Sequence, residues 1–600
     1  MSMKNDVRRA TGGDRRGARR LRLSRRGTLR GPLPGAGTPR TVRGPRLRYA
    51  SAPPDSPGTR RLFYALFAGI LAALVGGMGW FVVRWDHPSS VALFAVLSVL
   101  FFGSAYGLAR QVVALTTRRG GLPSLKSLER RPRVAILYTT MNDVVPECLQ
   151  AIHQDYPVDV FVLDDSSRPE ARETVDRISA ARKFTVVRRT ARRGFKAGAI
   201  NDWFAVHGGK FDYFVLLDAD SFLPSDWVGE ALRFAEHPAN ARVAIFQGLI
   251  NIWNFDTRFV QTLAPMSRVG QFEWEERLAN SLDTVFCYGH NVLMRRSAVS
   301  EIGGFVEGYV SEDFATVVAL ADRDWHSRFV PLHTYEATPE NVRGFIKRQN
   351  KWTRGAMEFL AFARRSDLPA SRKFHLLQTP VSHFANLLLP VGMLLTVYGF
   401  TSSYSGAGQL LTALAVNPLG TFWSIPLFRY LSVIGLLSAV PTILVLLRCK
   451  IGWGTYWRHR WLSGGVSALA LPYEAVSMAS YLSRRIRQVP VTPKSESPLG
   501  AVDVLYLARY SLLLQAVVIA GLLLVNPVGA IFNVTWLAPM VLSPLVILHF
   551  SGPPDLTVGP LSVPVGAQDV PSWEPRPFVV HASLSQIRSN GRIPAAWMSA

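Results

Sequence analysis

Long apolar segments lie on both sides of a soluble stretch, and this arrangement restricts the possible folds more than any other feature of the sequence. Residues 62–83 and 90–109 each approach the ~20 apolar residues that an α-helix needs to cross a bilayer. Four more such segments follow the soluble stretch, at 384–400, 430–448, 506–525 and 530–549. We therefore predict two transmembrane helices within 62–116, a soluble domain at 117–378, and an α-helical bundle of about six spans in all.

The positive charge predicts how this bundle is oriented. Much of the net charge of +25 lies in the first 61 residues, which are rich in Arg, Gly and Pro. We expect 1–61 to be a disordered basic tail, suited to an anionic lipid surface rather than to nucleic acid. By the positive-inside rule, the tail, the soluble domain and the C-terminal end all lie in the cytoplasm.

The second membrane part, 379–550, contains one apolar segment that we do not expect to span. Residues 463–483 include Pro472 and Glu474, and a carboxylate at mid-bilayer costs a few kcal/mol. We predict an interfacial helix on the cytoplasmic surface. The stretch 551–600, with repeated Pro, Gly and Ser, is predicted to be a second disordered tail.

The soluble domain alternates between strand-like and helix-like segments. Strands are predicted at 133–140, 158–164, 184–189 and 213–218, each separated from the next by a helical stretch. This alternation favours an α/β fold with a parallel sheet and right-handed crossovers. Ligands then bind beyond the carboxyl ends of the strands.

Charged residues follow three of these predicted strands. Asp218 and Asp220 end the fourth strand and suit a hard cation such as Mg²⁺ or Mn²⁺, although an acidic turn is the simpler alternative. Asp165 follows the second strand, where it can meet a uracil or ribose, or cap a helix. Lys196, in RRGFKAGAIN, offers a point charge for a phosphate.

Two later motifs add candidates for catalysis and for acceptor binding. FCYGHNVLMRR places Cys287 and Tyr288 ahead of a strand-like run. The motif SED contains Glu312 and Asp313 in a partly apolar setting, where a raised pKa would suit Asp313 as a general base.

A third motif, RQNKWTRG at 348–355, combines an aromatic side chain with basic ones. Trp352 can stack on the face of a sugar, and Lys351 and Arg354 can meet a diphosphate. The alternative is a helix with an aromatic anchor and a basic surface.

Together these motifs resemble the processive family-2 glycosyltransferases of the cellulose-synthase and hyaluronan-synthase kind. The resemblance covers roughly residues 60–550 and includes VPVTPK at 489–494, which is similar to the gating loop of cellulose synthases. It implies a GT-A-type (Rossmann-like) catalytic domain that uses a nucleoside-diphosphate sugar and Mg²⁺ or Mn²⁺. The motifs that carry it are, in order, Asp165, Lys196, Asp218-x-Asp220, Glu312-Asp313 and Trp352.

The resemblance also implies a role for each matching residue. Asp313 would deprotonate the acceptor hydroxyl, and Trp352 would hold the acceptor sugar. The nucleotide would be held by Asp165 at the uridine, by Lys196, by Asp218 and Asp220 with the metal, and by Thr492 and Lys494 of the gating loop.

Some positions depart from the cellulose-synthase pattern. Arg348 stands where Gln is expected, Lys351 replaces Arg, and Val489 replaces Phe in the gating loop. The run Tyr288-Gly289-His290-Asn291 is closer to the glucosyltransferase of osmoregulated periplasmic glucans, which also has Arg at the position of Arg348.

These features predict a bacterial inner-membrane enzyme that polymerises UDP-glucose into a β-linked glucan and extrudes it. Its partners would be the UDP-sugar, the growing glycan, the bilayer and a periplasmic export partner, with no nucleic acid. Two alternatives stay open: transfer of one sugar to a polyprenyl-phosphate or other lipid, and a membrane channel or scaffold with a vestigial sugar site.

Overall fold

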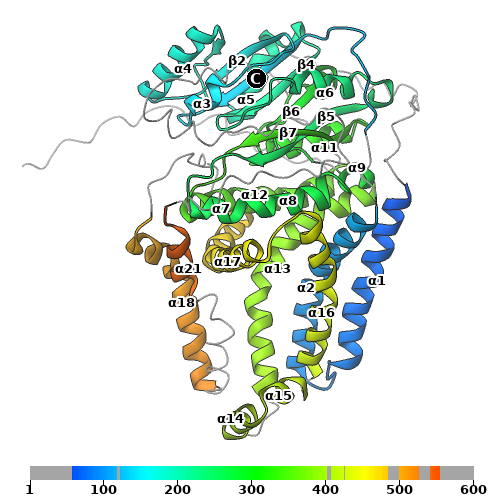
Figure 1. Cartoon of the computed structure of the whole chain (residues 1–600), viewed down its shortest axis with the longest axis vertical. Coiled ribbons are helices and arrows are strands. Elements are labelled where there is room, and N and C mark those ends of the chain that lie inside the picture. Colours follow the sequence, from blue (N-terminus) through cyan, green and yellow to red (C-terminus); the bar gives the residue numbers. More distant parts are fainter. Residues whose placement is uncertain are drawn as a thin grey trace, which may run out of the picture.

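The computed structural model describes residues 57–117, 122–284, 286–401, 407–424, 426–483, 499–525 and 541–553. These residues form an α/β domain placed on one end of a bundle of long helices (Figure 1). The predicted gating loop at 489–494, and most of the two predicted tails, lie outside the described residues.

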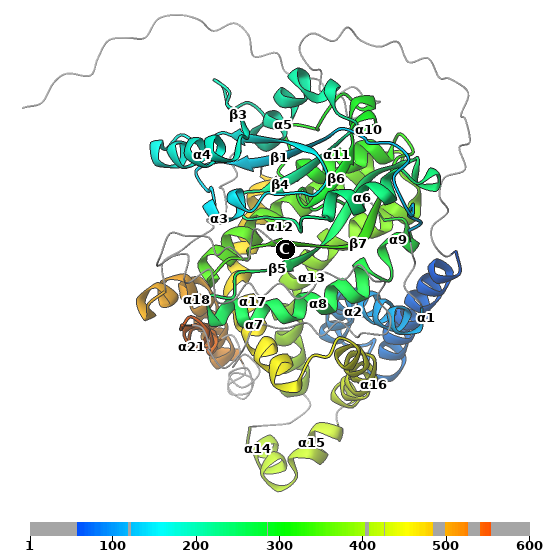
Figure 2. The ribbon, with the colours of Figure 1, turned by 45° about the horizontal axis from the view of Figure 1, so that its top comes forward.

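A seven-stranded sheet forms the centre of the domain, and its strand order is β3-β2-β1-β4-β6-β5-β7 (Figure 2). The strands are β1 (Val134–Thr140), β2 (Val158–Asp164), β3 (Thr185–Val187), β4 (Tyr213–Asp218), β5 (Val243–Ile252), β6 (Val292–Arg295) and β7 (His326–Glu336). The four predicted strands, β1 to β4, are parallel as expected. The prediction of a wholly parallel sheet is wrong at β6, which is antiparallel to both β4 and β5.

The reversal at β6 follows from the path of the chain. β5 and β7 run parallel to each other. In the described residues between β5 and β6, the helices do not carry the chain back to the end of the sheet where β5 begins. β6 therefore starts at the edge where β4 ends, and residues 286–291, just before it, reach the carboxyl end of β4.

Helices cover both faces of the sheet, so both faces are buried. Ala135 and Leu137 of β1 pack in one core with Trp203, whereas Ile136 packs in the opposite core with Trp227. This alternation is the side-chain period of a strand. The helices of the domain around the sheet are α3 (Pro146–Gln150), α4 (Pro169–Arg182), α5 (Phe195–Val206), η1 (Gly208–Lys210), α6 (Trp227–Ala235), η2 (Pro238–Asn240), α10 (Arg296–Glu301) and α11 (Glu312–Ala321).

The segment between β5 and β6 connects the domain to the long helices. It contains α7 (Arg258–Leu263), η3 (Ala264–Met266), α8 (Ser267–Gly270), the π-helix η4 (Gln271–Glu275) and α9 (Ala279–Leu282). Arg110, from the second long helix, donates from Nε to Glu273 of η4 at 2.8 Å, and Glu273 is only 1% exposed. An ion pair with a buried carboxylate therefore joins the domain to the bundle.

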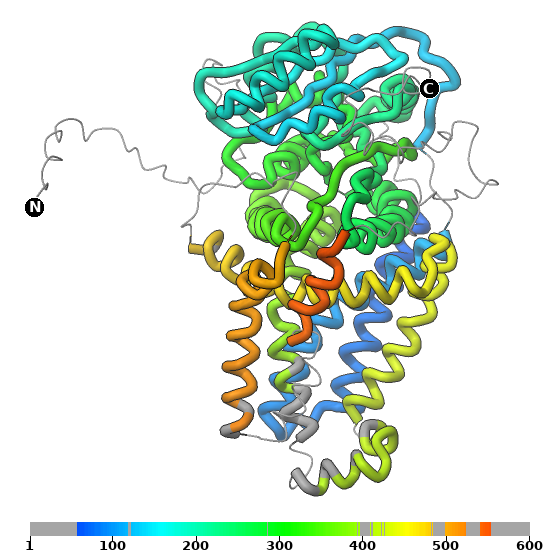
Figure 3. The backbone as a smooth tube through the Cα atoms, turned by 60° about the vertical axis from the view of Figure 1, so that its left-hand side comes forward, coloured from blue at the N-terminus to red at the C-terminus, as the bar shows by residue number. Residues whose placement is uncertain are grey.

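Four described helices are long and apolar enough to span a membrane: α1 (Pro57–Phe81), α2 (Pro88–Thr116), α16 (Pro426–Arg448) and α18 (Ala501–Val525). They coincide with four of the six predicted spans. The predicted span 384–400 falls in α13 (Ala370–Thr401), which runs alongside them in Figures 1 and 3. The predicted span 530–549 lies mostly outside the described residues, which resume before α21 (Ser543–Phe550).

Two helices lie across the domain-side end of the bundle, α12 (Val342–Arg365) and α17 (Trp453–Leu482) (Figures 1 and 3). α12 packs against both α13 and α17. α17 includes the predicted helix 463–483, except its last residue, but begins ten residues earlier. The short helices α14 (Ala407–Val416) and α15 (Pro418–Ser424) lie at the opposite end of the bundle.

Candidate active site

A lysine and a carboxylate meet at the carboxyl end of β4. Lys196, in the first turn of α5, places Nζ 2.5 Å from Oδ1 of Asp218 and 2.8 Å from the carbonyl oxygen of Gly289. Burial lowers the pKa of Lys196, but the Asp218 carboxylate outweighs burial and the pKa is raised. Two of the residues predicted to bind the nucleotide are thus in direct contact, and Lys196 is a fixed positive charge.

The second aspartate of the strand-end motif, Asp220, is 4% exposed and follows in the turn. Among the residues that the structure describes, no three or more His, Cys, Asp or Glu side chains converge as a metal site. Asp218 and Asp220 supply two carboxylates. These suit a hard divalent cation if oxygens of a bound ligand complete its coordination. The donor set fits a cation bound together with a diphosphate.

His290 lies beside Asp218 because of the antiparallel direction of β6. Its Nε2 is 2.5 Å from Oε2 of Glu336, and its Nδ1 is 2.8 Å from the carbonyl oxygen of Tyr288 and 3.6 Å from Oδ2 of Asp218. Burial lowers the pKa of His290, but Glu336 and Asp218 raise it to about 9. Both ring nitrogens therefore carry a proton, and His290 is a second cation here.

The predicted general base lies next to these cations. Asp313 and Glu312 occupy the first turn of α11, and burial raises the pKa of both carboxyls, an effect that Lys351 and Lys196 oppose. Gly289 has φ +78°, and a Cβ atom at this position would lie 2.8 Å from Oδ2 of Asp313. Only glycine lets the loop approach the carboxylate this closely.

The loop that carries the base is supported from α12. Glu358 accepts hydrogen bonds from the backbone nitrogens of Val310 and Ser311, each at 2.9 Å. Burial raises the pKa of Glu358 to about 7. A Cβ atom on Gly355 would lie 2.0 Å from Oγ of Ser311, so α12 and the loop are in direct contact.

α12 also brings the aromatic and basic residues of RQNKWTRG to the site. Trp352 is 54% exposed, and the guanidinium of Arg348 lies 4.7 Å from the centre of its ring. Lys351 interacts electrostatically with Glu312 and Asp313, and its predicted contact with a diphosphate stays a prediction. Arg354 is largely buried and lies near Glu358.

The two other predicted acceptor residues, Cys287 and Tyr288, directly precede Gly289. Cys287 is 2% exposed, its Sγ accepts from the backbone nitrogen of Gly289 at 3.3 Å, and burial raises its pKa to about 12. The hydroxyl of Tyr288 donates to Glu275 of the π-helix η4 at 2.9 Å. Cys287 interacts electrostatically with Asp313, and the Sγ of Cys287 and the hydroxyl of Tyr288 each already have a protein partner.

Asp165 lies at the end of β2 and is held by arginines. Arg189 makes a bidentate pair with it, at 2.8 Å from Nε and 2.6 Å from Nη2, and Arg192 lies 3.5 Å away. Thr492 and Lys494 lie outside the described residues.

Four residues of the site are outside the sequence-based predictions: His290, Glu336, Glu358 and Arg189. His290 lies inside the motif FCYGHNVLMRR, and Glu336 ends a strand, which is a usable signal. Nothing local marks Glu358 or Arg189, because their partners are distant in sequence.

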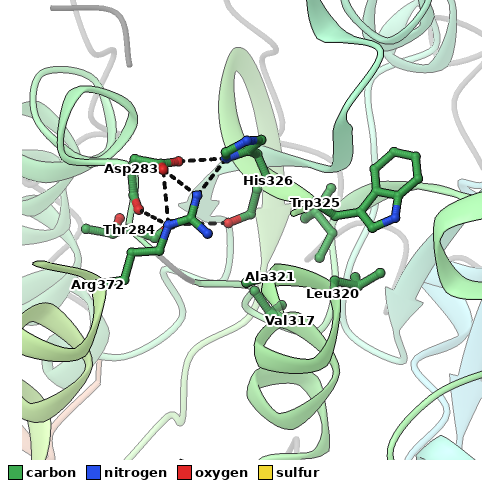
Figure 4. Close-up of a pocket in the computed structure, with 10 residues that line it drawn as sticks. Asp283, Thr284, Val317, Leu320, Ala321, Trp325, His326 and Arg372 are labelled. Atoms are coloured by element: carbon green, nitrogen blue, oxygen red, sulfur yellow. Dashed lines mark hydrogen bonds and ion pairs between the residues drawn. The ribbon is translucent and has the colours of Figure 1, made fainter. Parts of the chain in front are cut away.

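A separate group of charges, the Asp283 cluster, comprises Asp283, His326 and Arg372, which Figure 4 shows, together with Arg328. Asp283 lies 3.0 Å from Nε of Arg372, 3.0 Å from Nδ1 of His326 and 2.7 Å from Nη1 of Arg328. Burial alone would raise the pKa of Asp283, but these partners hold it well below its usual range. The cluster fastens the start of α13 to the first residues of β7.

Comparison with known proteins identifies the domain. Residues 213–456 match the family described as glycosyl transferase family group 2. This stretch, less than half of the chain, is therefore similar to family-2 glycosyltransferases. The matched region runs from β4 through α11 and α12 into α17, so it includes Asp218, Asp313 and Trp352.

Its curated relatives include several proteins named glucans biosynthesis glucosyltransferase H. The one from Xanthomonas oryzae is 25% identical over 409 residues, 60% of this chain and 62% of the relative. The one from Rhodopseudomonas palustris is 28% identical over 306 residues, 44% of this chain and 40% of the relative. The aligned region thus spans less than two thirds of these relatives. These relatives are glucosyltransferases of the kind that the run Tyr288-Gly289-His290-Asn291 resembles.

Solved structures that resemble this chain include a mannosyltransferase from Pyrobaculum calidifontis in complex with GDP-mannose and Mn²⁺. It has a TM-score of 0.43 and 20% sequence identity, and the alignment covers 66% of this chain and 99% of that one.

Proposed function

We propose that this protein is an inverting glucosyltransferase of the bacterial inner membrane, which polymerises UDP-glucose into a β-linked glucan and extrudes it. The names of the relatives support glucose and a glucan. The observation that carries the reaction is the contact of Gly289 with two groups. A Cβ atom at this position would meet the Asp313 carboxylate, and its carbonyl oxygen accepts from Lys196.

Asp313 acts as the base in this proposal. Its carboxylate takes the proton of the acceptor hydroxyl, whose oxygen forms a bond to C1 of the donor glucose. The bond between C1 and the diphosphate oxygen breaks at the same time, and UDP leaves with the electron pair. This single displacement inverts the anomeric carbon. The raised pKa of Asp313 makes it a stronger base than an ordinary carboxylate.

The departing diphosphate gains negative charge, and the cations around Asp218 stabilise it. Lys196, His290 and Lys351 supply fixed positive charge. Asp218 and Asp220 would hold Mg²⁺ or Mn²⁺, which would neutralise diphosphate charge as a Lewis acid. The uridine contact is assigned to Asp165, and closure over the diphosphate to Thr492 and Lys494.

Polar groups continue from Trp352 into the helix bundle and support a path for the product. Behind Trp352, Oγ1 of Thr353 is 3.3 Å from Nδ1 of His383 on α13, which is 3.6 Å from Oε2 of Glu474 on α17. His383 and Glu474 are 9% and 6% exposed. Ionisable groups among apolar helices are costly and are typically functional. We assign them to the glycan path, which an export partner would continue.

The experiment is product analysis with the full chain in liposomes containing Mg²⁺ or Mn²⁺. UDP-glucose, UDP-N-acetylglucosamine, UDP-glucuronate and GDP-mannose are supplied in turn, and the products are digested with linkage-specific hydrolases. A long β-glucan from UDP-glucose supports the proposal. A product of one sugar on a lipid would replace it with the single-transfer alternative, and polymer from another donor would change the substrate. The Asp313→Asn variant serves as the inactive control.

A further inference from the structure

The first turns of α17 carry a row of exposed tryptophans. Trp453, Trp457 and Trp461 are spaced four residues apart, so they lie on one side of the helix. They are 52%, 57% and 56% exposed. None of these rings belongs to the site described above, and so large an exposed aromatic surface indicates a binding partner.

The opposite side of the same turns is packed against the protein. Leu462 and Val466 are 0% and 2% exposed and lie in a core with Ile346 of α12. Nδ1 of His459 is 3.3 Å from the carbonyl oxygen of Thr262. The tryptophan row therefore points away from the catalytic domain and from α12.

The charge around the row has one sign. Arg458 and Arg460 are both exposed, one on each flank of the row, because they lie one residue after Trp457 and one before Trp461. Among the described residues, no carboxylate lies within ion-pair distance of either arginine. The sequence has no Asp or Glu between 426 and 473. The partner of this surface is therefore anionic.

The position of α17 indicates what that partner is. α17 lies across the domain-side end of the bundle, next to the end of the spanning helix α16 (Figure 3). At this level a bilayer presents its headgroups. Tryptophan rings prefer the boundary between headgroups and acyl chains, and arginines reach lipid phosphates from their apolar stems.

We infer that the Trp453–Trp461 side of α17 binds the headgroup layer of an anionic phospholipid leaflet. The indole rings lie at the acyl boundary, and Arg458 and Arg460 contact the lipid phosphates. Because α17 packs against α12, which carries Lys351 and Trp352, the lipid contact also holds the helix that lines the active site. The inference goes beyond the proposed function, since it concerns the lipid and not the sugar.

A lipid-binding measurement tests this without requiring catalysis. The full chain is extracted from vesicles of equal phosphatidylcholine and phosphatidylglycerol, and the retained lipids are counted by native mass spectrometry. Each basic residue near an anionic surface contributes about 1 kcal/mol to lipid binding. Removing one arginine should therefore weaken phosphatidylglycerol retention about fivefold. The variants are Arg458→Gln, Arg460→Gln and the double change.

The control is Arg177→Gln, an exposed arginine of α4 in the domain, away from the helix bundle (Figure 1). We expect it to retain phosphatidylglycerol like the unchanged chain. Equal retention by the double variant and the unchanged chain would overturn the inference, as would a loss in Arg177→Gln of the same size.

A second measurement tests the tryptophans. In nanodiscs, sugar transfer by the unchanged chain should rise severalfold when phosphatidylglycerol is added to phosphatidylcholine. The double change Trp457→Ala, Trp461→Ala should abolish that rise, whereas Trp423→Ala, at a 50% exposed tryptophan of α15, should keep it. A rise that survives the double change would contradict the inference. If neither the unchanged chain nor any variant transfers sugar, the proposed function fails. The number of retained phosphatidylglycerol molecules then still decides whether α17 binds anionic lipid.

Discussion

Two charged groups of this protein use carboxylates in opposite ways. In the Asp283 cluster, one carboxylate is surrounded by two arginines and a histidine, and its pKa falls well below the usual range. In the site around Asp313, two adjacent carboxylates share one helix turn, and burial raises the pKa of both. The first arrangement stabilises the charged form of the carboxylate, and the second favours uptake of a proton.

The two groups are close in sequence. Asp283 precedes the FCYGHN motif, and Gly289 within that motif contacts Asp313. A carboxylate whose negative charge is fully balanced by cations is suited to holding segments of the chain together. A carboxylate whose charge is only partly balanced is suited to taking up a proton. The stretch 283–291 thus has a structural anchor at one end and the reactive contact at the other.

The largest expected effect comes from removing the reactive carboxylate. Asp313→Asn should lower kcat by about 10²- to 10⁴-fold, the usual contribution of a general base, while UDP still binds. Initial rates and calorimetric UDP binding measure the two properties. Asp322→Asn, at the other end of α11, is the matched control and should keep near-normal turnover. Near-normal turnover of Asp313→Asn would remove this residue from the role of base.

Breaking the anchor should instead cost stability. Asp283→Asn leaves Arg328 and Arg372 without their counter-charge in a buried place, and we expect a loss of about 3–5 kcal/mol in the free energy of unfolding. Denaturant unfolding of the purified protein measures it. The control is Asp503→Asn, whose partner Arg343 lies 2.6 Å away in a much more exposed pair, with an expected loss of at most about 1 kcal/mol. Equal losses would show that the Asp283 cluster is no anchor.

The same cluster predicts a dependence of stability on pH. Nδ1 of His326 is 2.7 Å from Nη2 of Arg372, which can only donate, and burial lowers the pKa of His326 although Asp283 opposes this. Since the folded pKa lies below the unfolded one, the contribution is complete above about pH 6.5 and is lost as the pH falls.

Lowering the pH from about 7 to about 5 should therefore reduce the free energy of unfolding, by at most about 1.4 kcal/mol per pH unit for this one group. His326→Asn keeps an acceptor toward Arg372 but does not titrate, so its loss over the same range should be smaller. Identical pH profiles for the two proteins would count against this assignment.

The smallest expected effect concerns the support of the base. Glu358→Gln keeps an oxygen that can accept from Val310 and Ser311 but removes the charge, so we expect kcat to fall only about fivefold. Glu358→Ala removes both hydrogen bonds, so its kcat should be lower still. Steady-state kinetics should show the change in kcat and leave the donor KM nearly unchanged. An unaltered kcat in the alanine variant would mean that the loop holds Asp313 unaided.

The sequence predicts much of this architecture because the signals are local. The four parallel strands follow from alternating apolar segments, and Asp218 and Lys196 meet because both lie at the carboxyl edge of that sheet. The antiparallel β6, the π-helix η4 and the pairing of His290 with Glu336 depend on contacts between distant segments. No periodicity in the sequence marks them, so the fold of the first half was predictable and the inner arrangement of the site was not.

The reversed strand β6 has a consequence for the way such a site can change. Because β6 runs against β4, the loop that enters β6 and the turn that leaves β4 share one edge, and Gly289 connects them through Lys196. Exchanging either segment alone between related enzymes would mismatch the other. The turn at 218–220 and the loop at 286–291 therefore depend on each other, and an exchange between related proteins should move them as a pair.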